Sequence, residues 1–196
     1  YLDHLSGAPL APEVREAMQP FLNVHHHGLA AREAIASARE QFAQLIGGTP
    51  EEILFTSSGT EANNLAVKGT AFAQRERGNH IVLSNIEHPS IEQSVVWLEE
   101  NGFKATRVPV DAKGFISPNA IAEAVTDQTI LITTHHASHD LGTIQDIPAI
   151  STIAAERAIP FLVDATASGG WLPIDVPAAN ISLLTLAPHR FGGPQG

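Results

Sequence analysis

Short apolar runs and longer helical segments alternate along most of this chain, and this alternation limits its possible folds more than any other feature. The expected strands are apolar throughout, which is typical of parallel strands buried on both faces. They are expected at residues 53–55, 80–83, 105–110, 129–134, 160–163 and 181–186. Helices are expected at residues 12–21, 29–46, 91–101, 118–125 and 147–157, with a further helix from residue 61. The pattern predicts an α/β domain with helices on both faces of a mainly parallel sheet.

The composition indicates a globular protein without thiol chemistry. The 196 residues are 43% hydrophobic and 16% charged, which fits one domain with a sizeable core. A formal net charge of −10 disfavours nucleic acid, which requires a basic face, and disfavours an anionic membrane surface. Cysteine is absent, so these residues form no disulfide, thiolate metal site or thiol nucleophile. No apolar run approaches the roughly 18 residues of a membrane span and no signal peptide precedes Tyr1, so we expect a cytoplasmic protein.

The stretch Ile53–Gly69, ILFTSSGTEANNLAVKG, joins an expected strand to an expected helix. Its apolar start is followed by a turn of hydroxyl and glycine residues, Thr56–Thr60, and by a helix expected to open at Glu61. The free amides and the positive dipole end of a helix N-terminus favour a phosphate group. An ordinary helix cap that binds nothing explains the same serine and threonine residues.

Ligands of parallel α/β sheets bind beyond the carboxyl ends of the strands, so the polar residues there are candidates for a site. They lie at residues 56–60, 87–88, 135–140, 164 and 187–190. Asp164 follows the apolar run Phe161–Val163, so its carboxylate is expected at a strand end, where it can hold a cationic ring nitrogen opposite a phosphate. A role for Asp164 as a cap or turn former is the alternative.

The residues at these positions resemble the class V aminotransferases, and among them the cysteine desulfurases, which are fold-type I enzymes that use pyridoxal phosphate. The resemblance covers the whole chain in order. Its motifs are Tyr1-Leu2-Asp3, FTSSGTEANNLAVKG at 55–69, SNIEHPSI at 84–91, GTIQDI at 142–147, VDATASGGWLPID at 163–175 and HRFGGPQG at 189–196. It implies a three-layer fold, the large domain of these transferases.

The resemblance implies a role for five residues. Gly59 and Thr60 match the residues that hold the cofactor phosphate, and His88 matches the histidine that stacks on the pyridine ring and assists proton transfer. Asp164 matches the aspartate that keeps the pyridine nitrogen protonated. His189 matches the histidine that precedes the lysine to which the cofactor is bound as a Schiff base.

Four positions around the same ligand depart from the family pattern. Arg190 stands in place of the lysine, and arginine cannot form the Schiff base because its guanidinium stays protonated; the last lysine of the chain is Lys113. The serine that binds phosphate is Ala187, and the glutamine that meets the phenolic oxygen of the ring is Ala167. His139 replaces an asparagine that meets the same oxygen. Because these changes cluster at one site, we predict that lysine-dependent catalysis is lost.

The resemblance also implies what the chain lacks. Family members are about twice as long, so residues 1–196 are expected to form a single large domain with an entry segment at 1–28 and without the small C-terminal domain and its catalytic cysteine loop. The family's pocket borrows residues from a second subunit, which implies a homodimer. A second polypeptide that supplies the missing C-terminal half is a further hypothesis.

Two broad readings of the function follow from these matches and losses. In the first, a family enzyme holds pyridoxal phosphate without a covalent bond through Thr60, His88 and Asp164, while Arg190 offers its charge to the phosphate or to a substrate carboxylate. In the second, the chain is a non-catalytic scaffold or binding partner on the same fold.

A third reading is a new histidine-based or metal-assisted hydrolase. Histidines 135, 136 and 139 with Asp140, and the run His25–His27, supply groups that suit zinc. Neighbouring residues of a strand point to opposite faces, so at most one of His135 and His136 can join His139. The spacing matches no metal motif, and we predict no metal ligand.

Overall fold

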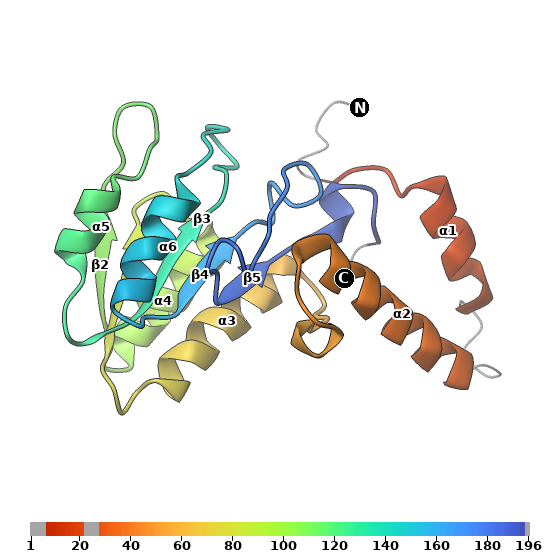
Figure 1. Cartoon of the computed structure of the whole chain (residues 1–196), viewed down its shortest axis with the longest axis horizontal. Coiled ribbons are helices and arrows are strands. Elements are labelled where there is room, and N and C mark those ends of the chain that lie inside the picture. The colour runs from red at the N-terminus through yellow and green to blue at the C-terminus, as the bar shows by residue number, and fades with distance from the viewer. Residues whose placement is uncertain (1–6, 22–27, 195–196) are drawn as a thin grey trace.

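The computed structural model describes residues 7–21 and 28–194, and its centre is one parallel sheet (Figure 1). The sheet has five strands in the order β2-β1-β3-β4-β5, and every neighbouring pair is parallel. The strands are β1 His80–Ser84, β2 Lys104–Val108, β3 Thr129–His135, β4 Phe161–Asp164 and β5 Leu183–Thr185. The predicted α/β class and parallel sheet are therefore confirmed.

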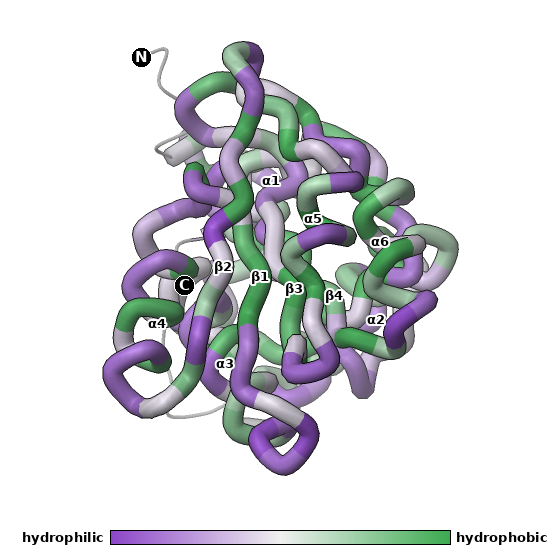
Figure 2. The backbone as a smooth tube through the Cα atoms, turned by 90° about the vertical axis from the view of Figure 1, so that its left-hand side faces the viewer, coloured by the Kyte–Doolittle hydropathy of each residue, from purple (hydrophilic) through white to green (hydrophobic). Residues whose placement is uncertain are grey.

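Helices cover both faces of the sheet because successive apolar residues of each strand point to opposite sides. The helices are α1 Pro12–Met18, α2 Gly28–Ile46, α3 Gly59–Ala73, α4 Pro89–Glu100, α5 Pro118–Ala124 and α6 Ile147–Glu156. Residues of α3 and α4 pack with Ile81 and Leu83 in one core, whereas residues of α5 and α6 pack with Val82 in the other. Figure 2 shows hydrophobic colouring along β1 and β3, which lie inside the sheet.

The N-terminal helices α1 and α2 lie beyond the β5 end of the sheet in Figure 1. Of the predicted entry segment 1–28, residues 1–6 and 22–27 lie outside the described residues, and so does the run His25–His27. None of the described helices is both long enough and apolar enough to cross a membrane.

Two predictions for the stretch 53–69 are wrong. Residues 53–55 form no strand, because no described strand lies beside them, and the side chains of Leu54 and Phe55 are 66% and 42% exposed. Helix α3 begins at Gly59 and not at Glu61, because the Ser58 side chain caps it by accepting a hydrogen bond from the Glu61 amide.

Candidate functional site

The carboxyl ends of the strands bring residues from distant parts of the chain to one edge of the sheet. Asp164 is the last residue of β4, and His135 is the last residue of β3. His88 caps α4 after β1, and Arg190 lies in the short 3-10 turn Pro188–Arg190 after β5. Gly59, the first residue of α3, lies close to this edge, because a Cβ atom built on it would lie 3.7 Å from the Cβ of Ala187.

Asp164 is a buried carboxylate that the protein holds in one orientation. Its side chain accepts hydrogen bonds from Asn63 Nδ2 at 2.8 Å and from the Thr166 amide at 2.9 Å. The Thr185 hydroxyl has one proton, which goes to Asn63 Oδ1 at 2.7 Å, since Asp164 Oδ1 lies farther away at 3.4 Å. A carboxylate has about four acceptor sites. Two donors therefore leave room for a further N–H group.

Asn63 connects this carboxylate to the histidine across the site. Its side chain is 1% exposed, and Nδ2 donates both to Asp164 Oδ2 and to Ser90 Oγ at 2.9 Å. Sequence reasoning missed Asn63, because an asparagine on the buried face of a helix has the same sequence pattern as any polar helix residue. Its position in the first turns of α3, directly after the candidate phosphate turn, was the available signal.

His88 is held with one defined nitrogen facing its own helix. Nδ1 accepts a hydrogen bond from the Ser90 amide at 3.1 Å and lies 2.7 Å from Ser90 Oγ. The proton of the neutral ring is therefore on Nε2. Burial lowers the pKa of His88, and the nearby charge of Asp164 opposes this effect. His88 is thus neutral at pH 7 and packs edge-to-face on His139, with ring centroids 5.2 Å apart.

The second strand-end histidine, His135, belongs to a separate buried network. Its Nδ1 lies 3.1 Å from Glu87 Oε1, and its Nε2 lies 2.9 Å from Gln145 Nε2. The Ile116 amide donates to Gln145 Oε1, which fixes Gln145 Nε2 as a donor toward His135. His135 Nε2 therefore accepts from Gln145, and its Nδ1 faces Glu87 Oε1 as a donor. This network holds in place the loop that carries His88, because Glu87 directly precedes His88 in the chain.

The histidines at the end of β3 do not converge. His136 Nδ1 contacts Ser168 Oγ at 2.9 Å, on a different side from His135, as strand geometry predicts. His139 lies against His88 and reaches Asp140 at 3.4 Å. Within residues 7–21 and 28–194, no group of three or more potential metal-ligating side chains is close enough to hold an ion.

The N-terminus of α3 is already partly occupied by a carboxylate of the protein. Glu61 accepts hydrogen bonds from the Ser57 amide at 2.6 Å and from Ser57 Oγ at 2.7 Å, and these bonds lower its pKa. The amides of Gly59 and Thr60 have no acceptor among the described residues. These two N–H groups remain available for an anion.

Arg190 brings a positive charge to the same edge. Its Nε atom is buried and has no hydrogen-bond partner among the described residues. Burial is the main cause that lowers the pKa of His88 and of His189, and the positive charge of Arg190 lowers both pKa values further. A guanidinium with a buried and unused N–H group suits an anionic ligand.

Burial lowers the pKa of the four histidines 80, 88, 136 and 189, and this predicts an acid-sensitive fold. Such a histidine takes up its proton first in the unfolded chain, so its contribution to stability is present above the unfolded pKa of about 6.5 and is lost as the pH falls. We expect the variant His80→Gln to lose less unfolding free energy than the wild type between pH 7.5 and pH 5.5, as measured by urea unfolding.

His80 is enclosed between two neighbouring strands. Its ring nitrogens lie 2.8 Å from Thr129 Oγ1 and 2.9 Å from Thr106 Oγ1 on neighbouring strands. Carboxylates with lowered pKa values, such as Glu61, titrate below 4.5 and so outside this window. Equal losses in variant and wild type would show that His80 does not titrate in this way.

Comparisons with known proteins identify relatives of the whole chain. A family model described as aminotransferase class-V matches residues 1–196. Cysteine desulfurase IscS of Dictyoglomus turgidum is 43% identical over 204 residues, covering 100% of this chain and 52% of that protein. The enzyme of the same name from Methanosarcina thermophila is 42% identical, with 100% and 50% covered. The chain thus spans about half the length of the curated relatives it matches.

Solved structures agree with these matches. A structure described as SspA in complex with cysteine superposes with a TM-score of 0.95 at 39% identity and covers 100% of this chain and 59% of its own. A NifS-like protein gives a TM-score of 0.94 at 28% identity, with 100% and 56% covered. These proteins have the fold of this chain over its full length.

Proposed function

This chain belongs to the class V aminotransferase family, and from that premise we propose that it is a cysteine desulfurase-like protein that binds pyridoxal phosphate without a covalent bond. The observation that carries the proposal is the meeting of Asp164, His88 and Arg190, whose buried Nε has no partner among the described residues, at one edge of the sheet. Lysine-dependent catalysis is lost in this proposal, because Arg190 occupies the lysine position.

The hydrogen-bond donors and acceptors of this site fit pyridoxal phosphate, which carries an anionic phosphate group. The free amides of Gly59 and Thr60 and the unused Nε–H of Arg190 would hold the phosphate or another acidic group. Asp164 retains acceptor capacity for the N–H of a pyridine ring. Ala187 and Ala167 offer no polar atom at the two positions where the family has serine and glutamine. Fewer polar contacts imply weaker binding than in a complete site.

Pyridoxal phosphate supplies a protonated ring that accepts electrons from a substrate carbon. The residues of this chain prepare its environment. Asp164, fixed by Asn63 and Thr166, stabilises a positive ring nitrogen. His88 presents its Nε2–H outward because Nδ1 is engaged by Ser90, so it can donate a hydrogen bond into the site at neutral pH.

The two other functions are supported less well. A metal-assisted hydrolase would need ligands that converge, whereas His135 and His136 enter separate hydrogen-bond networks. A non-catalytic scaffold remains the second candidate, and the replacement of four cofactor-contact positions favours it. In either case we propose a homodimer.

A titration of the purified chain with pyridoxal phosphate tests the proposal. We expect a bound chromophore in the absorbance spectrum that dialysis removes. Asp164→Asn should raise the Kd about tenfold or more, because a hydrogen bond to a charged group contributes about 1.5–3 kcal/mol. Asp127→Asn, at an exposed aspartate, should leave the Kd unchanged. If the wild-type chain gains no chromophore, the cofactor-binding function is refuted and the non-catalytic scaffold is the remaining candidate.

A further inference from the structure

Two histidines lie in contact at the candidate site, and they differ in what surrounds their ring nitrogens. His88 is the N-cap of α4, and His139 lies in the loop between β3 and α6. Their rings pack edge-to-face with centroids 5.2 Å apart. At this separation a positive charge on one ring opposes a positive charge on the other. The pair therefore takes up one proton more easily than two.

His88 is held in a form that resists protonation. Its Nδ1 accepts a hydrogen bond from the Ser90 amide at 3.1 Å, and this bond caps α4. A protonated ring has an N–H group on both nitrogens, so it cannot accept this bond. Protonation would also place a positive charge at the positive end of the helix dipole. A proton on His88 therefore removes a cap and opposes the dipole of α4.

His139 has surroundings in which a ring can carry a proton. Its Nε2 lies 3.4 Å from Asp140 Oδ2, and its side chain is 28% exposed. The Asp140 side chain is 79% exposed, so water reaches this contact. A neighbouring carboxylate and water both stabilise a charged imidazole. His139 is thus the member of the pair whose contacts accommodate a proton.

The charges near the pair act on His88 in both directions. Burial is the main cause that lowers the pKa of His88. The charges of Asp164 and Asp140 raise this pKa, whereas those of His139 and Arg190 lower it. The net effect is a lowered pKa, which agrees with the cap geometry in keeping His88 neutral.

Other titratable side chains near the pair are held by contacts or charges of their own. Glu87 Oε1 faces His135 Nδ1 at 3.1 Å in the separate buried network. His189 is the third histidine at this edge. Burial is the main cause that lowers its pKa, and the charge of Arg190 lowers it further. His189 therefore resists a proton as well, which leaves His139 to accept it.

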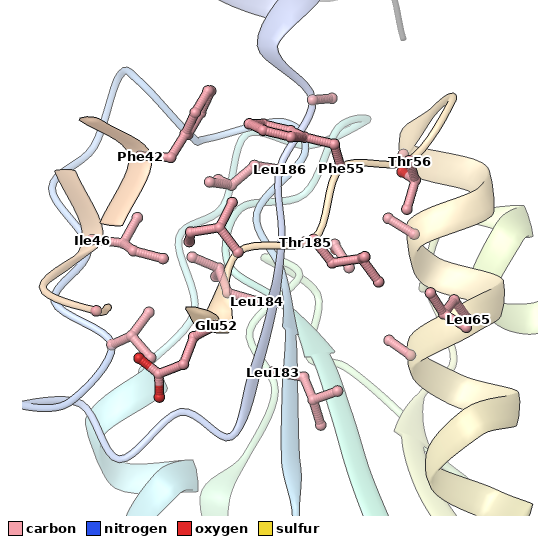
Figure 3. A pocket seen from close by; sticks show the side chains of 18 of the residues that line it. Phe42, Ile46, Glu52, Phe55, Thr56, Leu65, Leu183, Leu184, Thr185 and Leu186 are labelled. Atoms are coloured by element: carbon pink, nitrogen blue, oxygen red, sulfur yellow. The ribbon is translucent and has the colours of Figure 1, made fainter. Parts of the chain in front are cut away.

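The β5 side of the site adds little charge. An apolar hollow along β5 reaches His189, and Glu52 is the one carboxylate among the described residues that line it. Figure 3 shows Glu52 at the opposite end of this hollow from Phe55 and Leu186. The amide and hydroxyl of Thr49 donate to Glu52 and lower its pKa. The charge of Glu52 is therefore constant between pH 5.5 and pH 7.5.

We propose that His139 is the proton-carrying residue of the candidate site. With Asp140 as its counter-charge, it takes up the proton that His88 resists, and the affinity of the site for an oxyanion rises as the pH falls. This role deepens the proposed function and rests on its anion site, the free amides of Gly59 and Thr60 with the Nε–H of Arg190.

Sulfate binding to the purified chain at pH 7.5 and pH 5.5, in a buffer of low ionic strength, tests this role. Sulfate is the probe because its charge does not change over this range, whereas a phosphate group titrates at about pH 6. We expect the Kd for sulfate to fall about tenfold at pH 5.5, which is the effect of one added charge close to an anion. Circular dichroism at pH 5.5 checks that the chain is folded.

Two variants and one control assign the proton. His139→Asn should reduce the gain in sulfate affinity to less than about twofold, because it removes the group that becomes charged. Asp140→Asn should also reduce the gain, because the charged ring loses its counter-charge. His80→Gln is the matched control and should keep the full gain, since His80 is the first residue of β1 and the site lies beyond the other end of the strands.

Histidine ring signals in NMR spectra of the ligand-free chain give a second reading. The His139 signals should move between pH 7.5 and pH 5.5 and be absent from His139→Asn, whereas the His88 signals should stay in place, because its Nδ1 is occupied by the Ser90 amide.

Three results would overturn this role of His139: no gain in sulfate affinity in the wild type, a full gain in His139→Asn, or movement of the His88 signals in place of those of His139. A full gain in His139→Asn would assign the proton to another histidine. Failure to bind pyridoxal phosphate with the sulfate gain intact would refute the proposed function alone.

Discussion

Replacing Arg190 by lysine is expected to let this chain hold pyridoxal phosphate covalently. The wild-type chain should release the cofactor on dialysis after borohydride treatment, because a guanidinium has no free lone pair with which to attack an aldehyde. A lysine amine can lose its proton near neutral pH when burial and a neighbouring cation lower its pKa, and it then reacts. Arg190 already has a buried Nε atom in this structure.

The measurement is intact mass after borohydride reduction and dialysis. We expect the number of cofactor molecules covalently attached per chain to rise from background in the wild type to about one in Arg190→Lys. The reason is that the variant adds one reactive amine at the site. Arg75→Lys, at an exposed arginine outside the site, controls for reaction at surface lysines and should stay at background. Covalent capture by the wild type would show that another amine of the chain attacks the cofactor. No gain in the variant would show that the pocket does not orient the cofactor toward residue 190.

Asn63→Leu is expected to cause the largest loss of stability among the site variants. The asparagine side chain makes hydrogen bonds to Ser90, Asp164 and Thr185, and it is 1% exposed. Leucine has the same branched arrangement of side-chain heavy atoms but forms no hydrogen bond, so Ser90, Asp164 and Thr185 each lose one. Because each unsatisfied buried polar group costs about 1–3 kcal/mol, and more for a charged group, we expect a loss of about 4 kcal/mol.

The neighbouring asparagine provides a matched control for this variant. Asn64 donates to the Thr60 carbonyl at 3.0 Å and accepts from Lys68 Nζ at 2.8 Å, and its side chain is only partly buried. Asn64→Leu should cost less than about 1 kcal/mol in urea unfolding, because water replaces both hydrogen bonds. Similar losses at the two positions would mean that the buried network around Asp164 contributes little to stability.

The sequence by itself determined the fold class and the family. Parallel strands buried on both faces are apolar at nearly every position, so runs such as residues 160–163 predict the sheet from the local sequence alone. The carboxyl ends of those strands locate the candidate site, because parallel strands end at the same edge. The motifs of residues 55–69 and 163–175 indicate the class V aminotransferases, which the family match confirms. Each of these inferences needs only residues that lie close together in the sequence.

Only the tertiary structure decided which groups satisfy one another. The partners of Asn63 are 27, 101 and 122 residues away in sequence, so no local pattern predicts them. Residues 53–55 have the composition of a strand, but a strand exists only where a neighbouring backbone pairs with it, and none of the described residues does. Hydrogen bonds formed across the fold are therefore what the sequence alone could not predict here.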